Sequence, residues 1–201
     1  MNARQKIELE RLAGLTHAGA VRAAAAFSQL VDATVSAGRP IVHDRDATTR
    51  ARSGHSGSDA DSTGVFFEFD GCLDALVGIL FPAAGSERLV RSIVGIESGV
   101  LDPTIVESAL MEVGNILASH VASGIADALH SRLLPSIPAL AQGQAESEFA
   151  AWVERVVGAE APGVEAVLSA ENGDAVGRLV IVPTAPPGNE GGRAGPPADP
   201  V

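Results

Sequence analysis

A repeat runs through the sequence. When the chain of 201 residues is shifted against itself by 98 positions, identical or similarly apolar residues coincide in the two copies, among them Leu12 with Leu110, Leu15 with Val113, Phe27 with Ile125 and Pro40 with Pro138. Each copy has a long Ala- and Leu-rich stretch, a proline beyond it and a later hairpin-like run, at 74–82 and 174–183, which aligns after a small gap. Such a duplication predicts two halves related by a pseudo-twofold axis, with their long helices side by side.

The spacing of apolar residues predicts an α+β fold. Helical periodicity indicates long helices over about 5–35 and 103–133 and shorter helices over 84–95 and 146–158. Asp102 and Pro103 are typical of a helix start. Strand-like runs flank two turn signals, Asp70-Gly71 and Asn172-Gly173, so we expect two long helices packed on an antiparallel sheet.

The composition of the remaining segments sets the expected domain limits. We predict one domain over residues 1–184, formed by halves at about 5–98 and 103–184. The stretch 44–64 is polar, small and charged, and it predicts a mobile loop. Residues 185–201 are rich in Pro and Gly and predict a disordered tail.

Charge and cysteine content exclude several classes of partner. The formal net charge of −11 argues against binding to nucleic acid or to an anionic membrane, because both favour a basic surface. The single cysteine, Cys72, precludes an intrachain disulfide. The first residues are charged and contain no continuous apolar run, so we predict a cytoplasmic protein.

The helix over 103–133 carries a polar stripe. At 100° per residue, Ser108, Glu112, Asn115 and Ser119 fall within about 60° of arc, while the opposite side is apolar. A solvated helix face explains serine and glutamate equally well. Asn115 is less easily explained, because a mid-helix asparagine is unfavourable where Glu, Lys or Gln would be solvated as well. Gly114 lies toward the apolar side, where we expect close helix packing.

The same residues carry a family resemblance. Ser108, Glu112, Asn115 and Pro138 stand at the spacing of the signature of the CheC/CheX/FliY family, in which Asp or Ser is followed by Glu, Asn and a distant Pro. The segments EVGNI at 112–116 and AFSQLV at 26–31 also resemble that family. The resemblance covers roughly residues 5–184 and implies a pseudo-twofold, CheC-like fold.

The resemblance also implies a function and roles for the signature residues. The family dephosphorylates the chemotaxis response regulator CheY, whose aspartyl phosphate is bound beside Mg²⁺. Asn115 would then hold the attacking water, and Glu112 would pair with the regulator's lysine. Ser108 and Ser119 would belong to the contact surface. Pro138 would be structural and set the exit of the chain from the helix. The Mg²⁺ belongs to the regulator, so this chain is expected to need no cofactor of its own.

The first half departs from the signature. Gly14 stands where Glu is expected and His17 where Asn is expected, whereas Pro40 keeps the spacing. We therefore predict one active site per chain, in the layout of CheC with a degenerate first motif. The erosion leaves a second possibility open, a non-enzymatic adaptor that binds a response regulator, the receptor deamidase CheD or the flagellar switch.

Overall fold

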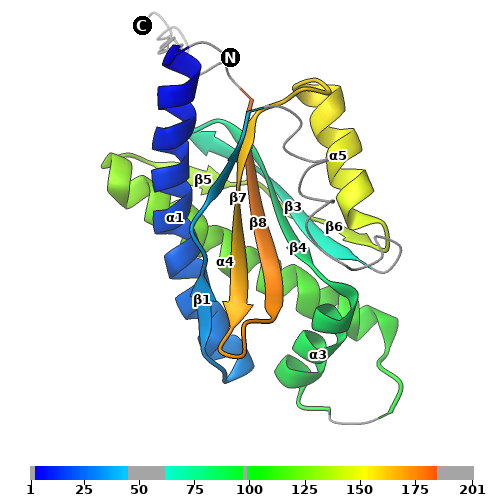
Figure 1. Cartoon of the computed structure of the whole chain (residues 1–201). Coiled ribbons are helices and arrows are strands. Elements are labelled where there is room, and N and C mark those ends of the chain that lie inside the picture. Colours follow the sequence, from blue (N-terminus) through cyan, green and yellow to red (C-terminus); the bar gives the residue numbers. More distant parts are fainter. Residues whose placement is uncertain (1–2, 45–61, 97–98, 185–201) are drawn as a thin grey trace, which may run out of the picture.

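The computed structural model describes residues 3–44, 62–96 and 99–184 (Figure 1). Two long helices, α1 (Ala3–Val31) and α4 (Pro103–Leu129), pack on one face of a single sheet. A shorter helix, α5 (Ala145–Val156), covers part of the other face. Helix α3 (Ala83–Val94) follows the strands of the first half and contacts both long helices. The expected α+β fold is confirmed.

The described part of the sheet contains eight strands, and every pairing is antiparallel. The strand order is β1-β7-β8-β4-β3-β5, with β2 also paired to β7 and β6 also paired to β3. The strands are β1 (Val35–Ala37), β2 (Ile41–His43), β3 (Thr63–Gly71), β4 (Ala75–Phe81), β5 (Leu133–Pro135), β6 (Ala139–Gln142), β7 (Gly163–Ala170) and β8 (Ala175–Pro183). Strands β4 and β8 form the central pair.

The two halves are interleaved. Strands β1 and β2 pair with β7 of the second half, and β5 and β6 pair with β3 of the first half. The long helices end at Val31 and Leu129, which are 98 positions apart, and β1 and β5 begin at the same offset. Strands β4 and β8 begin 100 positions apart, which is the small gap expected from the sequence. The pseudo-twofold arrangement predicted from the repeat is thus present in the strand order.

Side chains that alternate between the two faces of the sheet form two hydrophobic cores. Val65, Phe67 and Phe69 of β3 are buried on the helix side, where they pack with the apolar sides of α1 and α4. Phe66 points to the opposite face and packs against Phe149 of α5, with ring centroids 5.2 Å apart. Both faces of β3 are therefore buried from Thr63 to Phe67, whereas Glu68 and Asp70 are exposed farther along the strand.

Glycine permits the long helices to cross closely. A Cβ atom on Gly19 of α1 would lie 2.9 Å from the carbonyl oxygen of Val121, and one on Gly124 of α4 would lie 2.7 Å from Cα of Gly19. Side chains at either position would push the helices apart. The helices do lie side by side, as the repeat predicted.

The sequence predicts the start of α4 more accurately than its end. Asp102 caps the helix, because its carboxylate accepts a hydrogen bond of 2.8 Å from the backbone N–H of Thr104. The helix ends at Leu129, earlier than expected, because His130 adopts a left-handed conformation (φ 50°). The segment expected to finish the helix forms β5 instead. Asp70 and Gly71 likewise end β3 rather than form the turn, which follows them.

The domain limits given above remain predictions. Most of the expected mobile loop, residues 45–61, and the expected disordered tail, residues 185–201, lie outside the described residues. Within the described part of the chain, no helix combines the length and the apolar character needed to cross a membrane.

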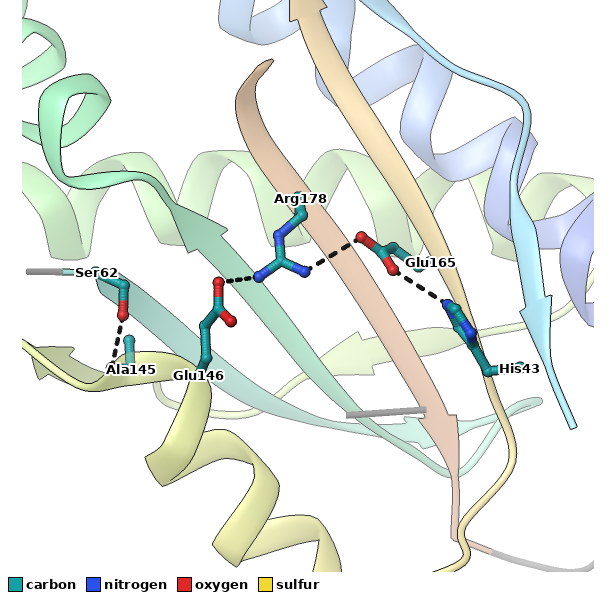
Figure 2. Close-up of polar contacts among 6 residues, drawn as sticks. All are labelled: His43, Ser62, Ala145, Glu146, Glu165 and Arg178. Atoms are coloured by element: carbon teal, nitrogen blue, oxygen red, sulfur yellow. Dashed lines mark hydrogen bonds and ion pairs between the residues drawn. The ribbon is translucent and has the colours of Figure 1, made fainter. Parts of the chain in front are cut away.

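Charged side chains are buried on the α5 side of the sheet (Figure 2). His43 Nε2 of β2 lies 3.1 Å from Glu165 Oε2 of β7, and Glu165 Oε1 accepts a hydrogen bond of 3.3 Å from Arg178 Nη1 of β8. Arg178 also pairs with Glu146 at the start of α5. The network therefore joins β2 of the first half to three elements of the second half.

Candidate functional site

The polar stripe of α4 faces outward. Ser108, Glu112, Asn115 and Ser119 are all exposed, whereas Leu110, Val113, Leu117 and Val121, on the other side of the helix, are buried. The helical repeat places Glu112 and Asn115 about 4.5 Å apart along the helix axis. A carboxylate and a side-chain amide are therefore presented together to any molecule that approaches this face.

Gly114 lies between the stripe and the sheet. It is buried, and a Cβ atom added to it would lie 2.5 Å from Cγ1 of Val65 on β3. The close packing expected at Gly114 is thus with a strand rather than with the neighbouring helix. The absence of a side chain lets α4 rest directly on β3 at the turn that carries Asn115.

Three contacts of α4 define the direction of the stripe. Gly114 faces β3, while Gly124 faces Gly19 of α1 and the carboxylate of Asp127 accepts a hydrogen bond of 2.5 Å from Arg22 of α1. On the helical wheel, Gly124 lies about 280° and Asn115 about 100° from Gly114, so these two residues point in opposite directions from the helix axis. The stripe consequently faces away from α1.

Pro138 has a different structural role from the one expected. The helix exit is made by His130, and Pro138 lies in the link between β5 and β6. This link is tied to β3: the backbone N–H of Ser136 donates to the carbonyl oxygen of Glu68 at 2.8 Å, and the N–H of Glu68 donates to Ser136 Oγ at 2.9 Å. Pro138 is partly buried and directly precedes β6.

The corresponding face of α1 lacks the site's chemistry. Gly14 and His17 are exposed, as Glu112 and Asn115 are on α4. A Cβ atom added to Gly14 would meet nothing within 4 Å. The face of α1 is therefore open, yet it offers neither a carboxylate nor an amide at the two signature positions.

No other described group competes with the stripe as a catalytic site. Burial raises the pKa of the Cys72 thiol, and hydrogen bonds from the backbone and Ser131 offset the effect only in part. A raised pKa disfavours the nucleophilic thiolate. In the described ranges, no three His, Cys, Asp or Glu side chains come together as metal ligands. The buried network around Arg178, which the sequence did not reveal, lies on the opposite face of the sheet.

The fold and the exposed stripe are similar to those of CheC-like proteins. The model of the CheC-like family matches residues 105–140, the segment that contains the whole stripe and Pro138. The comparison with curated proteins found no match.

Solved structures extend the similarity to the whole fold. FliY of Thermotoga maritima superimposes with a TM-score of 0.65 at 14% identity, covering 88% of this chain and 90% of FliY. CheX of Desulfovibrio desulfuricans gives a TM-score of 0.57 at 11% identity, covering 84% and 97% of the two chains. A chain of the CheX–CheY–BeF3–Mg²⁺ complex of Borrelia burgdorferi gives 0.54 at 13% identity, covering 84% and 96%. The resemblance to CheC, CheX and FliY proteins is thereby confirmed.

Proposed function

We propose that this protein accelerates hydrolysis of the aspartyl phosphate of a CheY-like response regulator. The observation that carries the proposal is the joint exposure of Glu112 and Asn115, one turn apart on a helix whose opposite side is buried. Both residues lie inside the segment that matches the CheC-like family. The CheX–CheY complex among the similar structures supports a receiver domain as the partner.

The reaction needs little covalent help from this chain. An acyl phosphate beside Mg²⁺ is already activated, so the missing component is a water molecule held in line with phosphorus. The Asn115 amide would accept a hydrogen bond from that water and orient it. Attack forms a new P–O bond, breaks the bond to the aspartyl oxygen, and releases the carboxylate and inorganic phosphate. Positioning of this kind can contribute several kcal/mol to catalysis.

Glu112 would provide the docking contact. Its carboxylate is exposed beside Asn115 and can pair with a lysine of the receiver's phosphorylation site. Ser108 and Ser119 extend the same face by one turn in each direction and would contact the receiver around the pair. The divalent metal would be supplied by the receiver, and we expect the encounter to take place in the cytoplasm.

The test is phosphate release from receiver domains charged with acetyl phosphate in the presence of Mg²⁺. Asn115→Ala should lower kcat by about a hundredfold while binding to the receiver is retained. Glu112→Ala should instead mainly raise KM. His17→Ala, at the corresponding place on α1, is the matched control and should leave both constants unchanged. A wild-type protein that accelerates no receiver of its own organism would refute the proposal.

One observation favours the alternative of an adaptor. Gly14 and His17 stand at the signature positions of the α1 face, so that half offers neither the carboxylate nor the amide. If the α4 face is also inactive in catalysis, the wild type would bind a receiver, CheD or a switch protein without releasing phosphate. Binding without acceleration, unchanged in Asn115→Ala, is the result that would establish this alternative.

A further inference from the structure

The polar stripe alone is a weak source of affinity. Exposed charge pairs contribute roughly 0.2–1 kcal/mol, whereas the large terms in protein interfaces come from buried apolar and aromatic anchors. A receiver that docks over Glu112 and Asn115 must therefore also find apolar contacts nearby. Two exposed isoleucines, Ile105 and Ile137, are candidates for these contacts.

Ile105 extends the stripe toward the start of α4. Its side chain is 41% exposed, and its position on the helical wheel is within about 20° of that of Glu112. The two residues are separated by about 10.5 Å along the helix axis. Lys, Glu or Gln would favour the helix more than a β-branched isoleucine at this partly exposed position.

Ile137 lies at the sheet edge that α4 covers, opposite the edge that α1 covers. It directly precedes Pro138 in the link between β5 and β6, and its side chain is 89% exposed. The link belongs to the edge that α4 covers: Leu140 of β6 is paired with Val65, the residue that contacts Gly114. Because the stripe faces away from α1, this edge is its nearest neighbour in the sheet.

The link also holds Ile137 rigidly. Ser136 exchanges hydrogen bonds with the backbone of Glu68, and Ser136 Oγ donates to the carbonyl oxygen of Ile137 at 3.0 Å. Prolines on either side, Pro135 and Pro138, further restrict the backbone. A rigid, exposed apolar residue binds a partner with little loss of conformational entropy. At the corresponding place in the first half stands Arg39, which is exposed and polar.

We propose that Ile105 and Ile137 are the apolar anchors of the receiver-docking surface, on either side of Glu112 and Asn115. The inference rests on the proposed function and specifies its partner: a receiver with apolar side chains bordering the phosphorylation pocket. A typical interface buries about 800 Å² on each partner, enough to include both isoleucines together with the stripe. The isoleucines supply affinity, and the carboxylate and amide supply orientation and chemistry.

The test compares two double variants with the same chemical change. Ile105→Ser/Ile137→Ser removes the proposed anchors, and Ile7→Ser/Ile41→Ser removes isoleucines of the first half that are 64% and 53% exposed. Binding is measured by titration with receiver domains carrying BeF3⁻ and Mg²⁺, and turnover with the phosphorylated receivers. Urea unfolding verifies that both variants are folded.

We expect the first double variant to raise Kd and KM by about tenfold to a hundredfold, the loss typical of interface anchors, with kcat unchanged. The control should match the wild type. If turnover by the wild type is observed and the first variant keeps its Kd and KM, the docking surface is refuted and the proposed function stands. If the wild type binds but does not catalyse, and the first variant binds weakly, the docking surface stands and the phosphatase is refuted. Equal losses in both variants also overturn the docking surface.

Discussion

Gly14 and Gly114 lie inside the two long helices, in opposite surroundings. Gly14 is exposed with open space around the position of a Cβ atom, while Gly114 rests against Val65. The two glycines therefore do not have the same structural explanation. At Gly114 the missing side chain is required by packing, and at Gly14 nothing in the described structure requires it.

Alanine should separate the two cases. Gly14→Ala is expected to raise the free energy of unfolding by about 1 kcal/mol, because alanine favours the helix and meets no neighbour. Gly114→Ala is expected to lower it by roughly 1–3 kcal/mol, because the added methyl group overlaps the buried Val65. Urea unfolding monitored by circular dichroism measures both, and effects of the same sign would contradict the packing assigned to Gly114.

The stripe could be predicted from single residues, whereas the charged network could not. Asn115 was recognisable because it is unfavourable in a helix interior, and its partners followed from the helical repeat. Glu165 and Arg178 stand singly in apolar strands, and His43 is far from both in the sequence. Their pairing depends on which strands are neighbours, and no local pattern carries that information.

At the scale of elements, the network takes the place of an apolar cluster. Ile41 is paired with Glu165, and Ala139, its equivalent in the second half, is paired with Phe66. Phe66 packs with the aromatic side chains of α5, whereas Glu165 is held by His43 and Arg178. The two ends of the same sheet face are therefore stabilised by different chemistry.

Breaking the network on one side should be costly. Arg178→Met is expected to lower the free energy of unfolding by about 3–5 kcal/mol, because Glu165 is left buried without its cation. Adding Glu165→Leu should restore part of the loss, because the more deeply buried uncompensated carboxylate is then gone, while Glu146 still lacks Arg178. Urea titrations of the single and double variants test this, and a double variant no more stable than Arg178→Met would contradict it.

The helices and the long hairpins were predictable, and the three-residue strands were not. The long helices and the β7–β8 hairpin were identified by periodicity and by Asn172-Gly173, whose turn contains a hydrogen bond of 3.1 Å from the N–H of Asp174 to Asn172 Oδ1. Strands such as β1 and β5 have three residues each, too few for a period to be recognised. The prediction that the helix continues to Leu133 was wrong, because no strong sequence signal marks the left-handed conformation of His130.

The whole molecule presents two related helix faces, of which only one carries the signature. Because the halves are related by the pseudo-twofold axis, the face of α1 has the geometry for a second site and lacks the side chains. The exposed positions Gly14 and His17 can be changed without disturbing the core.

Restoring the side chains should create a second site. In an Asn115→Ala background, Gly14→Glu/His17→Asn is expected to recover part of the phosphate release lost by removal of the amide. His17→Asn alone should recover much less, because the docking carboxylate is still missing. The assay is again release from acetyl-phosphate-charged receivers, normalised to folded protein. No gain from the pair, in a variant that folds and binds the receiver, would argue that the two faces are not equivalent.

The exchange of edge strands between the halves has one more consequence. A single cut in the backbone at Gly99 would separate the chain into two fragments, yet each fragment would keep strands embedded in the sheet of the other. The central β4–β8 pair would join them as well. Proteolysis there should cut the polypeptide without releasing either fragment, so the two fragments would remain a non-covalent complex.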